Sequence, residues 1–504
     1  MSDRDQSGAP PQSGRLQIEL ADNLRTMNPW WFGRPGVPVP GFHRWPFARL
    51  KQLLMQGIAP ATVLRGPRRV GKTILLRQVL EDLLQHGVTA SRVLYVPFDE
   101  LATLAKMTEP ILQVARWFEN EVLHASFNEA ALRHEPAFLF FDEVQNLEDW
   151  APQLKNLVDN HAVRALVTGS SSLQIAAGRD SLAGRVTTLD LGSLLLREIA
   201  ELRWSHSETP RWPANGQSDL TSLEFWHEGL AQAAASRDVR LRAFEAFSRL
   251  GAYPIAHQTP EPSWPELSDY LAETVIRRVL QHDLPWAKKG RRADKALLEE
   301  VFRLSCRYAG QSPGPSVFVP DLRTILRKEY GWQRIRSVLR SLDATLLLRL
   351  IEPLELRLKR QTAPAKICLC DHALRAAWLQ EEIPIDVEGL AKSPHLSDLA
   401  GRIVESVLGY FLASIPNLDV AYHPARTTEE EVDFIITVGT RRIPVEVKYR
   451  RRIDPFEDTR GLRAFLENTV YNAPLGLLVT LEDGVTVPDP RIVPISLSSL
   501  LWMR

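Results

Sequence analysis

The sequence of 504 residues is short of cysteine, of net charge and of long apolar runs. Its three cysteines, Cys306, Cys368 and Cys370, are too few for a disulfide framework or a four-ligand zinc site, so we expect them to be reduced and mostly structural. The 61 basic and 61 acidic side chains cancel, so any nucleic-acid surface must be a local patch. The N-terminus is polar, and no apolar run reaches the roughly 18 residues that span a bilayer. These features predict a cytoplasmic protein with no membrane partner.

The length and the 44% of hydrophobic residues predict two to four folded domains. After a tail at 1–15 that is expected to be disordered, the first domain is expected at 16–200. It should begin with an irregular, aromatic and proline-rich extension. Five apolar strands then alternate with helical stretches, which predicts a parallel sheet. The strands are expected in ATVLRG, RVLYVPF, AFLFFDE, RALVTGS and TTLDLGS.

The remaining chain changes pattern twice. Residues 201–293 are expected to form a helical lid with an exposed polar insert near 204–220. Residues 294–390 read as three helices followed by a two-stranded wing, an order that resembles a winged helix. Residues 391–504 start with an amphipathic helix and continue through the strands VDFIITV, IPVEVKY and LGLLVTL, which indicates a second α/β domain.

A phosphate-binding loop is predicted directly after the first strand. The sequence GPRRVGKT fits the pattern GxxxxGK[ST] and precedes the helical stretch ILLRQVLEDLL. In such a loop the backbone amides and the helix N-terminus hold phosphates, the lysine reaches the β- and γ-phosphates, and the hydroxyl binds Mg²⁺. The predicted ATP-binding residues are Gly66, Pro67, Arg68, Arg69, Val70, Gly71, Lys72 and Thr73, with Thr73 also a Mg²⁺ ligand.

A second motif follows about seventy residues later, where a buried strand ends in two carboxylates. Asp142 would hold Mg²⁺, and Glu143 would orient or deprotonate the attacking water. The alternative is an edge strand followed by a solvated acidic turn. On the next strand, Thr168 or Ser170 is a candidate sensor of the γ-phosphate, although a turn rich in Thr and Ser is more often only a cap.

Arginines could supply the positive charge that phosphoryl transfer requires. Arg185 follows the fourth predicted strand, and Arg277 and Arg278 lie in the predicted lid. The alternative for each is an exposed salt bridge.

The last domain carries the pattern PD-(D/E)xK. Asp433 lies on one predicted strand, and Glu446 and Lys448 lie on one face of the next, so Asp433 and Glu446 could share one Mg²⁺ while Lys448 positions water. Glu405, on the preceding amphipathic helix, is a possible further acidic residue. Such an array suits phosphodiester cleavage. The alternative is a charged outer face of an ordinary sheet.

Taken together, these motifs resemble those of a large bacterial and archaeal family of AAA+ ATPases, in which the ATPase domain is joined to a restriction-endonuclease-like domain of unassigned role. The motifs that carry the resemblance are GPRRVGKT, LFFDEVQNL, LVTGSSSL, LAGR at 182–185, GAYP at 251–254, GRIVESVL, EVDFII and PVEVKY. The resemblance implies a P-loop AAA+ core, a winged-helix middle domain and a nuclease-like domain, with the site residues in the roles given above. GAYP replaces the commoner GGYP, and the polar insert is unusual.

Three functions fit these parts. The first is an ATP-dependent DNA-processing enzyme that uses Mg²⁺-ATP and cleaves or binds DNA. The second is a nucleotide-switched DNA-binding or signalling module whose C-terminal cluster is catalytically silent. The third is a protein-remodelling scaffold ATPase. A homo-oligomer is compatible with each, because an arginine can act across a subunit boundary.

Overall fold

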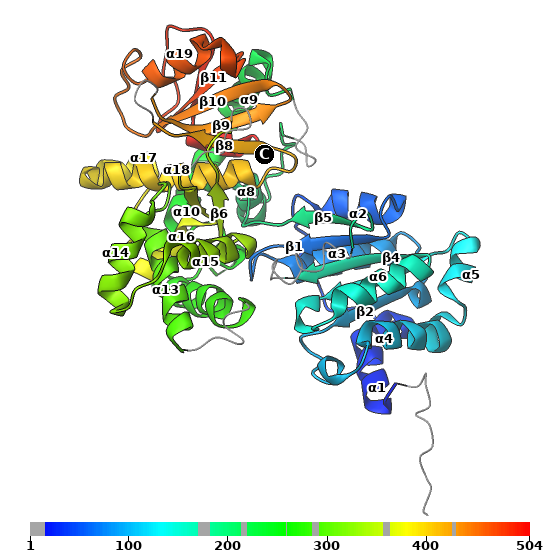
Figure 1. Ribbon diagram of the computed structural model, residues 1–504. Helices are drawn as coiled ribbons and strands as arrows, with labels where there is room; N and C mark the ends of the chain where they lie inside the picture. Colours follow the sequence, from blue (N-terminus) through cyan, green and yellow to red (C-terminus); the bar gives the residue numbers. More distant parts are fainter. Residues whose placement is uncertain are drawn as a thin grey trace, which may run out of the picture.

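The computed structural model describes residues 16–169, 182–212, 219–258, 260–284, 292–355, 363–425 and 430–504. They form two lobes: the first carries the strands β1 to β5, and the second carries the remaining helices and a second sheet (Figure 1). Within these described ranges, no helix is both long enough and apolar enough to span a bilayer.

The first lobe contains a five-stranded parallel sheet. Its strands are β1 (Ala61–Arg65), β2 (Val93–Pro97), β3 (Ala137–Asp142), β4 (Val163–Gly169) and β5 (Val186–Asp190). The order is β2-β3-β4-β1-β5, and every neighbouring pair is parallel. All five predicted strands are therefore confirmed. β2 and β3 are buried along their whole length, which agrees with a sheet that is covered on both faces, whereas the edge strand β5 is only partly buried.

Helices cover the two faces of this sheet. They are α1 (Ile18–Met27), α2 (Phe47–Gln56), α3 (Lys72–Gln85), α4 (Pro110–Phe118), α5 (Phe127–Leu132) and α6 (Trp150–Asn160). Successive residues of β1 point to opposite faces: Leu64 packs in the cluster that includes α3, and Val63 in the cluster that includes α6. The helix α1 precedes the aromatic and proline-rich segment that was expected to be irregular, and it was not predicted. Its Leu20 and Leu24 form an apolar stripe that is buried against this lobe.

The described part of the chain between 196 and 284 is largely helical. It contains α8 (Leu196–Trp204), α9 (Leu223–Ala235), α10 (Arg237–Leu250), α11 (Trp264–Tyr270) and two π-type helical segments (Leu271–Arg277 and Val279–Asp283).

The described part of the polar insert is an irregular loop whose side chains are mostly exposed or half-buried, but Trp212 departs from the exposed loop that was predicted. Trp212 is 1% exposed, and its backbone N–H donates to the Met503 carbonyl at 2.8 Å. Its indole packs edge-to-face on Trp226 and Phe225. The prediction was wrong for Trp212, because burying a large aromatic side chain gains free energy even within a polar segment.

Three helices and a hairpin follow. They are α13 (Arg292–Arg307), α14 (Pro315–Leu326), α15 (Trp332–Ala344), β6 (Leu348–Ile351) and β7 (Lys366–Leu369), and the two strands are antiparallel. Two further helices, α16 (His372–Leu379) and α17 (Val387–Lys392), lead to the last region.

The C-terminal region is a mixed five-stranded sheet with helices. Its elements are α18 (Ser397–Ala413), β8 (Asp419–His423), β9 (Val432–Val438), β10 (Arg441–Lys448), α19 (Arg460–Glu467), β11 (Gly476–Thr480), β12 (Ile492–Ser496) and α20 (Leu497–Trp502). The strand order is β12-β11-β10-β9-β8, parallel from β10 to β12 and antiparallel from β8 to β10. The predicted strands β9, β10 and β11 are confirmed, and β8 and β12 were not predicted.

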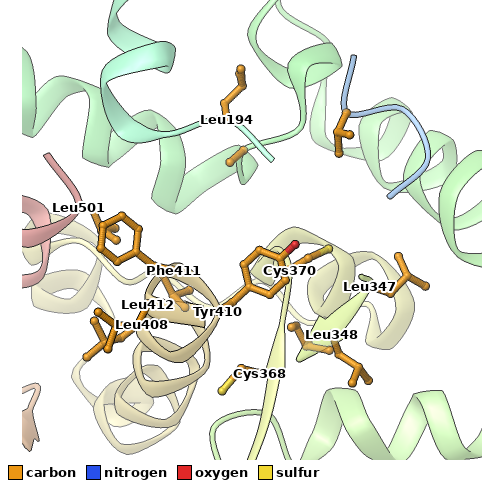
Figure 2. Packing of buried hydrophobic residues seen from close by; sticks show 14 of the residues in the cluster. Leu194, Leu347, Leu348, Cys368, Cys370, Leu408, Tyr410, Phe411, Leu412 and Leu501 are labelled. Carbon is orange, nitrogen blue, oxygen red and sulfur yellow. The ribbon is translucent and has the colours of Figure 1, made fainter. Parts of the chain in front are cut away.

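One apolar cluster joins the parts of the chain. Figure 2 shows Tyr410 of α18 beside Cys370, and Phe411 beside Leu501. All three cysteines are free and buried, as expected. Gly251, in the GAYP motif, has φ +75°, and a Cβ placed there would lie 2.4 Å from Asp371 Oδ1. This motif is thus a packing junction between α10 and α16.

Candidate active site

The predicted phosphate-binding loop lies between β1 and α3, at the carboxyl edge of the first sheet. Arg69 and Gly71 have positive φ values of 66° and 97°, which turn the chain tightly before α3 begins at Lys72. A Cβ at Gly66 would lie 2.1 Å from the Leu191 carbonyl oxygen, so a glycine is required there. The loop therefore has the shape that exposes backbone N–H groups at a helix N-terminus.

Lys72 points into this loop. Its ammonium donates to the carbonyl oxygens of Gly66 at 3.1 Å and Pro67 at 3.0 Å, and it lies 3.8 Å from Glu143 Oε1. The side chain is 3% exposed, and this burial lowers the pKa of Lys72. The positive charge is thus held beside the loop in which phosphates would lie.

Asp142 and Glu143 follow β3 at the same edge. Asp142 accepts hydrogen bonds from the hydroxyls of Thr168, Thr73 and Tyr95, the last at 3.2 Å. Burial raises the pKa of Asp142. These contacts hold the carboxylate next to the hydroxyl that starts α3, and they bring together the predicted residues of the two motifs.

Glu143 has a positive φ of 54°, which directs its side chain away from the line of the strand. Its backbone N–H donates to Thr168 Oγ1 at 3.0 Å, and the Gln145 side chain donates to its carboxylate. Thr168, predicted as a sensor, is therefore fully buried between the two acidic residues. Ser170, the other candidate, lies outside the described residues.

Two contacts join the loop to the region predicted as a lid, and sequence reasoning missed both. The Arg68 guanidinium pairs with Asp283 through two bonds of 2.7 and 2.6 Å, and Asp283 is 5% exposed. The Arg69 guanidinium lies 5.9 Å from the ring centre of Tyr270. No sequence signal marks Asp283, because the same helical stretch also holds Arg277, Arg278, Gln281 and His282. By contrast, Arg277 is exposed and pairs with Glu273.

Arg185 lies at the opposite edge of the sheet from the loop. Its carbonyl accepts from Ala61 N–H at the start of β1, and its side chain pairs with Asp159. The five residues of β1 separate it from the loop by about 16 Å. Within one chain Arg185 does not reach the predicted phosphate site, so its predicted role depends on a neighbouring copy.

A second charged cluster lies on the C-terminal sheet and brings together the four other predicted residues. Glu446 and Lys448 share one face of β10, with 2.5 Å between Nζ and Oε1. Asp433 of β9 accepts from Val447 N–H at 2.9 Å. Glu405 of α18 completes the group, and burial raises the pKa of both Glu405 and Glu446 well above the usual range.

Lys366 of β7 lies within this cluster and was not predicted from the sequence. Its ammonium lies 3.0 Å from Asp433 Oδ1 and 3.1 Å from Glu405 Oε2. The available signal was a lysine at the start of the apolar strand KICL. Across the described ranges, no three His, Cys, Asp or Glu side chains are arranged to hold a metal ion.

Comparison with known proteins gives a family match within the first lobe. Residues 59–200 match a family model described as an AAA domain. This match spans β1 to β5 and includes the phosphate-binding loop and the acidic motif Asp142–Glu143. The sheet and the loop agree with this match, so residues 59–200 are similar to AAA domains. The helices and the sheet that follow lie outside the match.

Relatives with curated sequences are themselves uncharacterised. A protein of Mycobacterium tuberculosis is 27% identical over 281 residues, which are 50% of this chain and 57% of the relative. A protein of Methanocaldococcus jannaschii is 32% identical over 140 residues, 28% of this chain and 27% of the relative. The chain thus spans little more than half the length of the first relative.

Among solved structures, AMPPCP-bound DnaA from Aquifex aeolicus is similar with 11% identity and a TM-score of 0.23, covering 61% of this chain and 89% of that chain. Drosophila ORC bound to DNA gives 14% identity and a TM-score of 0.22, covering 76% and 96%. TM-scores this low support no functional statement about this chain.

Proposed function

We propose that this protein binds and hydrolyses Mg²⁺-ATP and uses the nucleotide state to control a DNA-binding middle region. The observation that carries the ATP part is the convergence of Lys72, Thr73, Asp142 and Glu143 at one edge of the AAA-type sheet. The Thr73 hydroxyl and the Asp142 carboxylate are hard oxygen ligands and would hold Mg²⁺, which would neutralise negative charge on the phosphates.

The chain's own residues divide the chemistry. The loop amides and the α3 N-terminus bind the phosphates. The Lys72 ammonium gives up its hydrogen bonds to the loop carbonyls and donates to phosphate oxygens instead. Glu143 orients water or accepts its proton, and its distance of 3.8 Å from Lys72 supports this role. Thr168 fixes Asp142 and Glu143 through its hydroxyl and thereby couples the third strand to the fourth.

Phosphate binding has a direct route to the second lobe. Arg68 pairs with Asp283, and Arg69 lies over Tyr270, so both arginines that follow Pro67 contact the helical segment that we interpret as the lid. A phosphate group competes with the Asp283 carboxylate for the Arg68 guanidinium. Nucleotide binding would thus loosen or reorient this segment.

The middle region has the element order of a winged helix: α13, α14, α15 and then the β6–β7 hairpin. The apolar side of α15 is buried through Ile335, Val338 and Leu342, which leaves Arg336 and Arg340 exposed on the other side. Both arginines line a groove of about 690 Å³ between α15 and the hairpin, in which Glu352 and Glu355 lie on the hairpin side. The positive charge is concentrated on α15, the element that would meet a phosphate backbone.

Removing both arginines tests this assignment. The variant Arg336→Ala/Arg340→Ala is expected to bind duplex DNA about tenfold more weakly or worse, and the slope of log affinity against log salt should fall by about two, because each lost phosphate contact removes about one released counterion. Fluorescence anisotropy with labelled DNA at several salt concentrations measures both.

The matched control is Arg237→Ala, which removes an exposed arginine from α10. It should bind DNA as the wild type does. If the double variant keeps the affinity and the salt slope of the wild type, DNA does not bind on α15. If the wild type itself binds no DNA, the protein-remodelling scaffold is the better interpretation.

A second candidate activity is Mg²⁺-dependent cleavage of DNA by the C-terminal region, which we interpret as restriction-endonuclease-like. The juxtaposition of Asp433, Glu446 and Lys448 on β9 and β10 favours it. In such a site the carboxylates hold the metal, and Lys448 orients water or stabilises the charge on phosphorus.

We expect plasmid DNA to be cut by the wild type with Mg²⁺ or Mn²⁺, and at least about a hundredfold more slowly by Lys448→Ala, as for loss of one electrostatic group at the reacting centre. Gel analysis of supercoiled and linear forms reads this out, with Arg450→Ala as a nearby control for charge. Cutting that persists in Lys448→Ala would be due to a contaminant, and no cutting by either protein would leave a nucleotide-switched DNA-binding module.

Arg185 gives a reason to expect more than one copy in the active species. It lies on the edge of the sheet opposite to the loop, so only a neighbouring chain could bring it to the γ-phosphate. A head-to-tail arrangement of subunits would place this edge of one copy against the loop edge of the next.

A further inference from the structure

A buried lysine from the middle region lies among the carboxylates of the C-terminal cluster. The Lys366 side chain is 2% exposed, and its ammonium lies within 3.1 Å of one oxygen each of Glu405 and Asp433. Glu431 Oε1 lies 3.6 Å away, and the Phe434 ring centre 5.0 Å away. A buried ammonium loses its hydration, so surrounding negative charge must offset that cost.

Three separate elements meet at this ammonium. Lys366 is the first residue of β7, Glu405 lies on α18, and Asp433 lies on β9. Two carboxylates therefore approach one positive centre from different elements, as they would approach a divalent cation. They are spaced for an ammonium at about 3 Å and not for a metal ion, whose oxygen ligands lie at about 2.1 to 2.5 Å. This spacing agrees with the absence of a metal-holding group among the described side chains.

The cluster nevertheless keeps an unsatisfied oxygen. Glu446 is 9% exposed, and its Oε1 pairs with Lys448 at 2.5 Å. Its Oε2 is buried without a hydrogen-bond partner in the described part of the chain. Because an unpaired buried carboxylate oxygen is costly, this position attracts a donor or a cation. Asp433 and Glu446 lie on adjacent strands, so that oxygen belongs to the same charged cluster.

We propose that Lys366 is an internal counter-ion that competes with divalent metal for Asp433 and Glu405. The C-terminal cluster then binds a divalent ion tightly only when this ammonium is removed or withdrawn. The exchange leaves all bonds intact: the ammonium leaves the two carboxylates, and the metal ion takes its place. The inference concerns the cluster alone and is independent of whether α15 binds DNA.

Mn²⁺ binding to the full-length, nucleotide-free protein tests this competition. Lys366→Met removes the charge and keeps an unbranched apolar side chain of similar length. We expect this variant to bind Mn²⁺ at least about tenfold more tightly than the wild type, a difference of about 1.4 kcal/mol in binding free energy. The electron paramagnetic resonance signal of free Mn²⁺ gives the affinity. Adding Asp433→Asn to Lys366→Met should abolish the gained site, whereas sites elsewhere in the protein should remain.

Two further variants keep the test decisive. Lys392→Met removes an exposed lysine that pairs with Glu388 on α17, and Lys366→Arg keeps the positive charge; both should bind Mn²⁺ as weakly as the wild type. Equal affinity in the wild type and Lys366→Met would overturn the proposal. If Lys366→Met does not fold, the wild type still decides: Asp433-dependent binding with a Kd of about 10 µM or below, the range of dedicated sensor sites, would overturn it as well.

Discussion

Replacing Glu143 by glutamine is expected to lower ATP turnover at least about a hundredfold while nucleotide binding is retained. Glutamine keeps the size of the side chain and can still contact Gln145, but it cannot accept a proton from water. A loss of this size corresponds to about 2.7 kcal/mol of transition-state stabilisation and is the usual scale for one general base. Phosphate release measures turnover, and a fluorescent ATP analogue measures binding.

Glu148→Gln is the matched control, because Glu148 is exposed five residues further along. It should turn over ATP as the wild type does. Normal turnover in Glu143→Gln would show that this carboxylate neither orients nor deprotonates the water, and it would remove the second motif from the proposed mechanism.

Replacing Lys72 by alanine is expected to weaken ATP binding at least about a hundredfold. The ammonium is buried beside the loop and would make charge-assisted hydrogen bonds to the phosphates, so its removal costs about 2.7 kcal/mol or more of binding free energy. Isothermal titration calorimetry with ATP and Mg²⁺ measures the affinity, and circular dichroism checks that the variant is folded.

The exposed Lys106 offers a control, since Lys106→Ala removes the same charge from the surface of the same lobe. Wild-type affinity in Lys106→Ala together with a large loss in Lys72→Ala would locate binding at the loop. If Lys72→Ala binds ATP as tightly as the wild type, the loop is not the nucleotide site.

Short-range patterns explain which elements could be predicted. Most strands of the first sheet are largely apolar runs bounded by turn residues, because a sheet covered on both faces needs apolar side chains on both; the edge strand β5, VTTLD, is the exception. The strand β8 is half exposed and polar at its start, so its sequence DVAYH carries no such signal. Trp212 shows the converse: it lies in a polar segment, and only its distant partners Trp226 and Met503 explain its burial.

The candidate site divides in the same way. The loop and the acidic motif are each a short contiguous segment, so their chemistry could be predicted from the sequence. Arg68, by contrast, pairs with Asp283, which lies 215 positions away. Lys366 lies 67 positions from Asp433, on a strand whose other residues are apolar and buried, so its contact with Asp433 could not be predicted. Contacts of this kind depend on how the domains pack, and single-sequence patterns carry no information about that packing. The role of Arg185 stays a prediction, since it concerns a neighbouring chain.

We propose that ATP turnover in the first lobe is coupled to the binding of DNA by the middle region. Phosphate release from ATP by the wild type and by Arg336→Ala/Arg340→Ala, each with and without duplex DNA, tests it most directly. We expect DNA to change the ATP turnover of the wild type severalfold, and we expect the double variant to lose this response. Turnover that is the same with and without DNA in the wild type would contradict the account.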